Sequence, residues 1–211
     1  MEIRYVEELP STQLWLCDEV RAGRIAPPFA IIAKHQSAGI GSRGNRWEGR
    51  NRALTFSFAL SLKSLPSDLP IVSASIYFGY HFKRILEQRG SKVWLKWPND
   101  LYLGDKKLGG VLTSKIGEAL VVGIGANLTA PSEIYGALEP EISWNGVIEE
   151  FLSEIEQPWE WKPTFNKYKI EFELSSDFVF HYKGERVHAG EALLCDDGAL
   201  LLRGEKIYSA R

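Results

Sequence analysis

Residues 92–128 constrain the fold most, because they hold three strand-like segments joined by very short connections. In KVWLKW, residues 92–97, the apolar residues alternate with polar or partly polar ones. This pattern places Val93, Leu95 and Trp97 on one face of a strand and Lys96 on the opposite face. Pro98 cannot donate to a sheet ladder, so the strand is predicted to stop there.

The next two segments continue the same sheet. Residues 101–114 are predicted to form a hairpin centred on Gly104 and Asp105, a dipeptide suited to a primed turn. ALVVGIGANL, residues 119–128, reads as a buried strand that runs into glycines. Any fold for this chain must therefore contain a sheet built around this hairpin.

Strands and helices are mixed along the rest of the chain. The patterns predict strands at 28–36 and 53–62 and helices at 11–23, 70–90 and 143–157. In the strand 53–62, Leu54, Phe56, Phe58 and Leu60 share one face, and the other face carries Thr55, Ser57 and Ser61. This order of elements predicts an α+β fold with a mixed sheet.

The pattern changes from about residue 176. Strand-like pieces of four or five residues follow one another, separated by glycine turns, as in a small β-barrel. A unit of under 40 residues is only marginally stable alone, so it is expected to pack on the main domain. We therefore predict a catalytic domain at 1–174 and a small β-barrel domain at 175–211.

Composition and charge exclude several classes of protein. The net charge of the 211 residues is −2, which gives no general attraction to nucleic acid or membranes. We expect no signal peptide, because MEIRYVEELPS lacks a basic start and an apolar run, and no segment has the length of a membrane span. Cys17 and Cys195 form no CxxC pair and the four histidines show no ligand spacing, so we expect no protein-bound metal and a reducing, cytoplasmic setting.

Two further stretches have the composition of ligand sites. Residues 36–52 place three glycines among several arginines, and such residues leave backbone N–H groups open to an anion and supply forked donors for phosphate or carboxylate. The loop lacks the lysine-serine ending of a P-loop, and a solvated basic loop or a nucleic-acid patch has the same composition. Lys96 with Asn99 and Asp100, and the segment 123–127, lie at predicted strand ends, where sites are commonly built. The alternative to a ligand site is that Lys96 is an ordinary surface lysine and that the segment 123–127 is a glycine-rich bulge.

Taken together, these motifs resemble those of the biotin protein ligases over roughly residues 8–211. KWPNDLYLGDKKLGGVL nearly repeats the family's most characteristic motif, and VVGIGANL is similar to its Gly-x-Gly-x-Asn. STQ at 11–13 is similar to its Ser-Thr-Asn, AKHQSAGIGSRGNRW to its glycine-arginine loop, and YSAR to its Ser-Leu-Arg ending. The resemblance is to the short class without an N-terminal DNA-binding domain.

The resemblance implies both a fold and a reaction. The fold would be the mixed sheet of class II aminoacyl-tRNA synthetases with a small C-terminal barrel of the Src-homology-3 type. The enzyme would be a biotin–[biotin carboxyl-carrier protein] ligase, which joins biotin to ATP as biotinyl-adenylate. It would then transfer biotin to one lysine of a carrier protein, such as that of acetyl-CoA carboxylase. Mg²⁺ would accompany ATP, with Asp100 as a helper, no nucleic acid or membrane would take part, and a homodimer is left open.

The resemblance also implies roles for individual residues. Lys96 and Arg43 would be catalytic, with Lys96 neutralising the two anions that must meet. Biotin would be bound by Ser11, Thr12, Gln13, Gln36, Gly39, Ile40, Gly41, Ser42, Lys96, Gly110 and Gly123. ATP would be bound by Arg43, Arg46, Trp47, Lys96, Asn99, Lys107, Asn127 and Arg211. The glycine-arginine loop would close over the adenylate and exclude water.

The chain departs from the family pattern at several of these positions. Ile40, Ser42 and Asn45 stand where the family's loop has arginines, and Gln13 replaces an asparagine. Thr113 or Ser114 stands where many members have a glutamate. The arginine at the position of Ser42 is one that the family is thought to use on the adenylate phosphate, so either Arg43 takes over or the adenylate is released faster.

Three other readings are kept beside the ligase. One is a lipoate or octanoate ligase of the same fold, which would need a longer apolar tunnel. Another is a non-catalytic sensor of biotin or a nucleotide, which the presence of Lys96 disfavours. The third is a nucleic-acid binder, which the scarcity of aromatic residues among the loop arginines disfavours.

Overall fold

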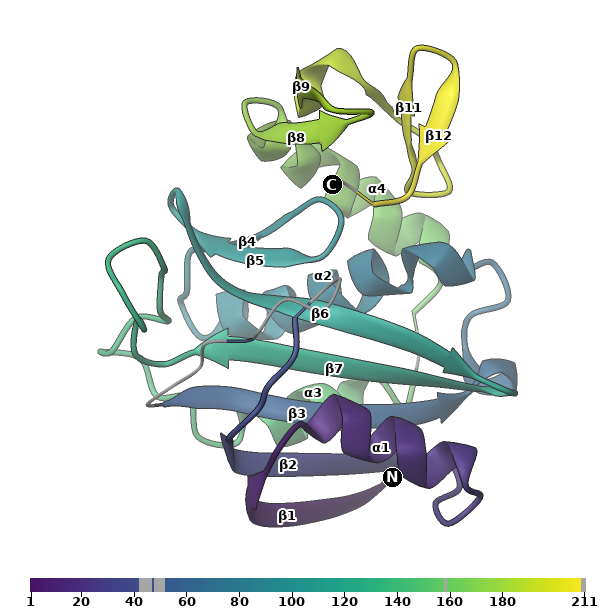
Figure 1. Cartoon of the computed structure of the whole chain (residues 1–211), viewed down its shortest axis with the longest axis vertical. Coiled ribbons are helices and arrows are strands. Elements are labelled where there is room, and N and C mark those ends of the chain that lie inside the picture. The colour runs from purple at the N-terminus through teal and green to yellow at the C-terminus, as the bar shows by residue number, and fades with distance from the viewer. Residues whose placement is uncertain (42–46, 48–51, 158, 210–211) are drawn as a thin grey trace.

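The structure is a computed structural model that describes residues 1–41, 47, 52–157 and 159–209. Its centre is a seven-stranded sheet with the strand order β1-β2-β3-β7-β6-β5-β4 (Figure 1). The strands are β1 (Glu2–Leu9), β2 (Phe29–Gln36), β3 (Ala53–Ser61), β4 (Val93–Lys96), β5 (Asp100–Leu103), β6 (Lys106–Ile116) and β7 (Ala119–Asn127). Only β1 and β2 pair in parallel, and all other neighbours are antiparallel, so the predicted mixed sheet is confirmed.

Strand β1 was not predicted from the sequence. Its partly buried residues are Ile3, Val6 and Leu9, which recur at every third position rather than every second. The strand is at the edge of the sheet, where burial on one face is incomplete, so the two-residue alternation is lost.

The opposite edge of the sheet is covered by side chains from the C-terminal half. The backbone N–H of Leu95 donates to Glu171 Oε1 at 2.6 Å, and that of Trp97 to Ser175 Oγ at 3.3 Å. These bonds occupy one donor of β4 and one just after its end, which would otherwise be free to pair with another strand.

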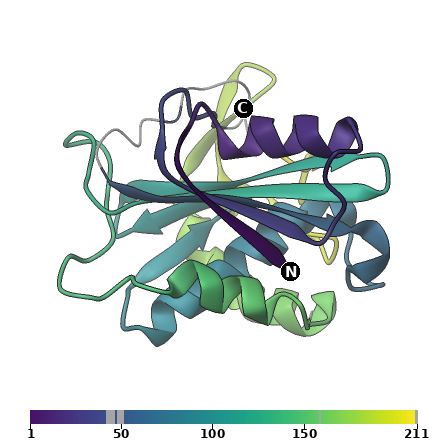
Figure 2. The same ribbon diagram turned by 90° about the horizontal axis from the view of Figure 1, so that it is seen from below.

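Helices lie on both faces of the sheet (Figure 2). One face carries α1 (Thr12–Arg21), and the other carries α2 (Ala74–Gln88), α3 (Val147–Glu154) and α4 (Trp161–Glu171). The predicted helices are therefore confirmed as α1, α2 and α3, while α4 was not anticipated. No helix in the described part of the chain combines the length and the apolar character needed to cross a bilayer.

The main core lies between the sheet and the three helices on one face. Phe56 and Phe58 of β3 meet Phe78 and Phe82 of α2 and Phe151 of α3, with ring centroids 5.1–5.8 Å apart in tilted or edge-on geometries. A smaller cluster of buried side chains lies under α1, formed by Leu16, Cys17, Phe29, Ile31, Ala59 and Val121. The apolar face predicted for residues 53–62 is thus the core face.

The C-terminal residues form two small sheets within the described chain. One pairs β8 (Val179–Tyr182) with β9 (Glu185–His188), and the other contains β10 (Leu193–Leu194), β11 (Leu200–Leu202) and β12 (Glu205–Ile207). These strands match the short segments predicted for this region, and we call residues 176–209 the C-terminal unit. The division at residue 174 stays a prediction, since the 3₁₀ turn Phe172–Ser175 spans it.

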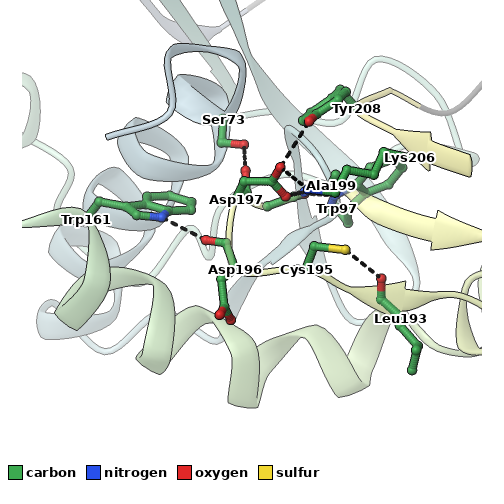
Figure 3. A network of polar contacts seen from close by, with 11 residues as sticks. Ser73, Trp97, Trp161, Leu193, Cys195, Asp196, Asp197, Ala199, Lys206 and Tyr208 are labelled. Carbon is green, nitrogen blue, oxygen red and sulfur yellow. Dashed lines mark hydrogen bonds and ion pairs between the residues drawn. The ribbon is translucent and has the colours of Figure 1, made fainter. Parts of the chain in front are cut away.

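The C-terminal unit is docked on the main domain by backbone groups of a single turn. Trp97 Nε1 donates to the carbonyl of Gly198 at 2.9 Å, and Trp161 Nε1 donates to that of Asp196 at 3.0 Å. Ser73 also donates to the carbonyl of Asp197 (Figure 3). Buried apolar residues of the unit, including Leu200, belong to the main core cluster. The unit therefore packs on the main domain, as its small size predicted.

Candidate active site

A cavity opens on the face of the sheet that carries α1. The lining residues are Ser11, Thr12, Gln13, Gln36, Ile40, Gly41, Trp47, Phe56, Ser57, Asn99, Asp100, Lys107, Gly110, Val111, Leu112, Gly123, Ile124 and Gly125. Eleven of the residues predicted for biotin or ATP are among them.

Small residues of three neighbouring strands make room for this cavity. Gly110 of β6 pairs with Gly125 of β7, and Gly123 pairs with Leu112 and Ser57 on its two sides. Paired residues project to the same face, so these glycines share one face of the sheet. A Cβ atom on Gly125 would lie 3.0 Å from Cζ2 of Trp47, so the indole ring lies directly on this glycine.

One end of the cavity is polar and is built on the start of α1. Ser11 is the N-cap, and its hydroxyl accepts from the backbone N–H of Leu14 at 3.3 Å. The next residue, Thr12, donates through its backbone N–H and its hydroxyl to Gln36 Oε1, at 2.7 and 3.0 Å. Ser57 donates to the Thr12 hydroxyl at 2.9 Å. The three side chains thus form one hydrogen-bonded chain from β2 through α1 to β3.

Gln13 fills the space beside this polar end. Its Nε2 donates to Ser114 Oγ at 3.2 Å and to the carbonyl of Val121 at 3.4 Å, which fixes the orientation of the amide. Its Oε1 is buried and has no partner among the described residues. A Cβ atom on Gly123 would lie 2.5 Å from that oxygen, so Gln13 and Gly123 together set the shape of the cavity floor.

The other end of the cavity is charged. Lys107 Nζ lies 2.6 Å from Asp100 Oδ1, and both residues line the cavity. Asn99 beside them donates from Nδ2 to the carbonyl of Val111 at 2.9 Å. An ammonium group and a carboxylate are therefore held on β6 and β5, which β7 separates from Ser57 on β3.

A β-bulge brings Lys107 to this face. Asp100 pairs with Gly110 and Leu101 with Gly109, but the register then shifts and Tyr102 pairs with Lys107. The shift puts Lys107 on the face of Asp100 and Tyr102, while Leu108 is fully buried. Bulges re-aim side chains next to active sites in this way.

Lys96 lies one strand beyond the cavity rather than in its wall. It pairs with Asp100 across β4 and β5, so it shares the cavity face, but it is not a lining residue. Its ammonium lies 4.3 Å from the ring centroid of Phe178 and 3.4 Å from the hydroxyl of Tyr102. Burial lowers the pKa of Lys96, against the opposing effect of the Asp100 carboxylate. The expectation that Lys96 faces away from Val93, Leu95 and Trp97 is confirmed, and its catalytic role stays a prediction.

Gly39 and Asn127 are also near the cavity without lining it. The carbonyl of Gly39 accepts from the backbone N–H of Trp47 at 2.8 Å, which closes the base of the glycine-arginine loop. Asn127 donates from Nδ2 to the carbonyl of Gly136 at 3.2 Å, while its buried Oδ1 has no partner in the described chain. The predicted binding of biotin by Gly39 and of ATP by Asn127 therefore stays a prediction.

Four predicted residues lie outside the described part of the chain. They are Ser42, Arg43, Arg46 and Arg211. The question of whether Arg43 replaces a family arginine at Ser42 is therefore one for experiment.

Ser57 and Gly125 line the cavity but were not among the predicted site residues. Ser57 had a usable signal, since it lies on the polar face of an otherwise apolar strand that is buried on both sides. Gly125 lies in the segment GIGAN, where only Gly123 and Asn127 were assigned.

The described residues contain no group of three or more side chains that could hold a metal by themselves. Among the lining residues that the structure describes, Asp100 alone carries a carboxylate. One carboxylate fits Mg²⁺ that is bound mainly through the phosphates of a nucleotide.

Comparison with known proteins places this site in a family. A model of the biotin/lipoate A/B protein ligase family matches residues 5–128. The chain is 38% identical over 127 residues to the bifunctional ligase/repressor BirA of Escherichia coli strain K12, a match that covers 57% of this chain. It is 28% identical over 141 residues, or 63% of this chain, to the biotin–[acetyl-CoA-carboxylase] ligase of Mycobacterium tuberculosis. The matches cover 38% and 52% of these two relatives, so the chain spans at most about half of their length.

Solved structures extend the likeness over the whole chain. The biotin acetyl coenzyme A carboxylase synthetase of Helicobacter pylori, with biotinylated ATP bound, is 44% identical with a TM-score of 0.91. The match covers 100% of this chain and 99% of that one. The biotin protein ligase of Aquifex aeolicus, in complex with biotin and ATP, has a TM-score of 0.76 at 23% identity over 99% of this chain and 96% of that one, and it supports the fold.

Proposed function

The chain belongs to the biotin/lipoate A/B protein ligase family, and from this premise we propose that it activates biotin with ATP and transfers the biotinyl group to a carrier protein. The relative from Helicobacter pylori, whose structure carries biotinylated ATP, supports the choice of both substrates. Names of other relatives support the carrier domain of an acetyl-CoA carboxylase as the acceptor.

The polar end of the cavity is the observation that carries the proposal. The cyclic urea of biotin has two N–H donors and one carbonyl acceptor. Gln36 Oε1 is an acceptor, and the hydroxyls of Thr12 and Ser57 can both donate and accept. If the N–H groups and the carbonyl of the ring found no hydrogen-bond partners in the cavity, each buried group would cost about 1–3 kcal/mol of binding free energy. The dithiolane of lipoate and the alkyl chain of octanoate offer no donors for this end, so biotin fits better.

The charged end of the cavity suits the first step. A carboxylate oxygen of biotin attacks the α-phosphorus of ATP, a new P–O bond forms, and the bond to the leaving pyrophosphate breaks. Two anions must be brought together before this can happen, and Lys107 lines the cavity at its charged end. Its ammonium would offset their repulsion and the charge that builds on the phosphate in the transition state. Lys107 would therefore share the neutralising role that the resemblance implies for Lys96, which lies on the same face one strand beyond Asp100.

The second step uses the same cavity. The amine of a carrier lysine attacks the acyl carbon of the adenylate, the amide bond forms, AMP leaves and the amine loses a proton. Trp47, which lies on Gly125, would cover the acyl chain and keep water from the mixed anhydride. The Oδ1 atom of Asn127, which has no partner among the described residues, would accept from an amine of the nucleotide base.

Asp100 would hold Mg²⁺ together with the phosphates of ATP. When bound, the ion would neutralise charge on the leaving pyrophosphate. Cys17 and Cys195 are both free thiols, in keeping with a reducing compartment, and we place the reaction in the cytoplasm.

Pyrophosphate release tests the proposal against its alternatives. The protein with ATP and Mg²⁺ is given biotin, lipoate, octanoate or no acid in parallel. We expect release with biotin only, and incorporation of biotin when a carrier domain is added. Release with lipoate or octanoate alone would instead make the chain a lipoyl or octanoyl ligase. Biotin binding with no release in any reaction would favour a sensor.

A further inference from the structure

The ammonium group of Lys96 is held by two aromatic rings. Nζ lies 4.3 Å from the ring centroid of Phe178 and 5.0 Å from that of Tyr102. Both distances are within the roughly 6 Å over which a cation is attracted to the face of a ring. No carboxylate of the described residues forms an ion pair with Lys96, although Asp100 is its neighbour on the next strand.

Aromatic partners leave the charge of Lys96 available to an anion. A paired carboxylate would neutralise the ammonium, whereas a ring stabilises it without adding a net charge. The stabilisation matters here because burial disfavours the charged form and lowers the pKa of Lys96. Neighbouring strands are about 5 Å apart, so this charge lies one strand beyond Asp100 at the charged end of the cavity.

Phe178 reaches this place from the C-terminal unit. It lies directly before β8, and its carbonyl accepts from the backbone N–H of Ala189 at 2.8 Å. Its ring packs on Tyr102 at 5.2 Å and on Trp94 at 5.5 Å, and these two rings are 5.3 Å apart. The three rings form a cluster on the cavity face of β4 and β5. Trp94 and Tyr102 belong to these strands, and Phe178 comes from the C-terminal unit.

We propose that Phe178 is a positioning residue, which holds the ammonium of Lys96 at the edge of the cavity so that it can bind the phosphates of ATP. The C-terminal unit would then contribute to nucleotide binding through a single ring, although it lies outside the segment that matches the family. The inference rests on the proposed function for the identity of the nucleotide.

Fluorination of the ring tests this without changing its shape. Mono-, di- and trifluorinated phenylalanine at position 178 progressively weaken the negative face of the ring. The dissociation constant for ATP is measured by titration calorimetry with saturating biotin, which requires no turnover. The same series is made in a Lys96→Met background. Fluorination of Phe180 is the matched control, because this buried ring of the same unit packs on Trp97 and carries none of the cation contacts found among the described residues.

We expect the dissociation constant to rise stepwise with fluorine number at Phe178, by about 2- to 30-fold in total. The melting temperature and the affinity for biotin should stay constant. In the Lys96→Met background, and in the Phe180 series, the dissociation constant for ATP should not change with fluorine number. An unchanged affinity for ATP through the Phe178 series, or an equal rise in the Lys96→Met background, would overturn the inference. A parent protein that binds ATP in this way yet releases no pyrophosphate would sink the proposed activity and leave the role of Phe178 standing.

Discussion

Two lysines lie 11 positions apart in the printed sequence, at 96 and 107, and only one lines the cavity. The alternation along residues 92–97 correctly placed Lys96 on the face opposite its apolar neighbours, and in the structure this is the cavity face. The position of Lys107 depends on the bulge between Leu101 and Tyr102, which moves the residue from one face of β6 to the other. A bulge of this kind leaves no clear sign in the sequence around Gly104, so spacing alone could not rank the two lysines.

Lys107→Ala should abolish most adenylate formation while the protein stays folded. The variant removes the only ammonium among the cavity-lining residues, and loss of one such contact costs roughly 3–4 kcal/mol, or a hundred-fold or more in rate. Biotin-dependent pyrophosphate release is the measurement. Lys106→Ala is the matched control, since that exposed neighbour does not line the cavity. Equal rates in the two variants would show that Lys107 is not the neutralising group.

At the scale of elements, the antiparallel strands were predictable and β1 and α4 were not. Alternation or a turn dipeptide marked β3 and the β5–β6 hairpin, but β1 buries only every third residue. Helix α4 has buried aromatic residues Trp161, Phe165 and Tyr168 at helical spacing, so its signal was present but had not been used. Pro163 in its first turn is compatible with a helix start.

Gly109→Ala and Gly123→Ala should both destabilise the protein, but only the loss of stability in Gly123→Ala should be relieved by a second substitution. A Cβ atom on Gly109 would lie 2.3 Å from the backbone oxygen of Gly125, so β6 and β7 must separate, at a cost of about 1–3 kcal/mol. At Gly123 the clash is with the end of the Gln13 side chain. Urea unfolding should show that Gln13→Ala recovers stability lost in Gly123→Ala but not in Gly109→Ala. Equal recovery in both would contradict the backbone clash.

His81 should make the helical layer sensitive to acid. It is 3% exposed on α2, and its ring nitrogens lie 3.3 Å from Glu154 Oε1 and 3.3 Å from the hydroxyl of Thr164. Burial lowers the pKa of His81, against the opposing effect of Glu154. Protonation therefore favours the unfolded chain, and stability is lost as the pH falls below about 6.5, the ordinary histidine value.

Urea unfolding at pH 7.5 and pH 5.5 checks this expectation. The midpoint should fall more between these two pH values in the parent protein than in His81→Gln, which keeps a hydrogen-bonding side chain but cannot titrate. An equal fall in both proteins would assign the acid sensitivity to other groups.

At the scale of the whole molecule, the C-terminal unit and the main domain share one core. Leu200 and Leu202 of the unit cluster with the apolar residues of α2 and the sheet, and the indoles of Trp97 and Trp161 bond to its backbone. The change in sequence pattern near residue 176 predicted a separate small unit and its need for support. It could not predict which side chains provide the support, because these contacts join residues more than 30 positions apart.

The protein should therefore unfold as one cooperative unit. Calorimetry should give a single transition whose calorimetric and van't Hoff enthalpies agree. A chain ending at Ser175 should melt at a lower temperature than the full chain, because it exposes Trp97 and Trp161. Two separate transitions in the full chain would instead support independent domains with a boundary near residue 174.

The orientation of the substrate in the cavity is the central claim, and a crystal structure with a non-hydrolysable biotinyl-adenylate analogue tests it most directly. We predict that the ureido ring hydrogen-bonds to Thr12, Gln36 and Ser57 at the polar end, and that the group replacing the phosphate contacts Lys107 at the charged end. A ring placed against Lys107 and Asp100, or an analogue bound outside the cavity, would contradict the account.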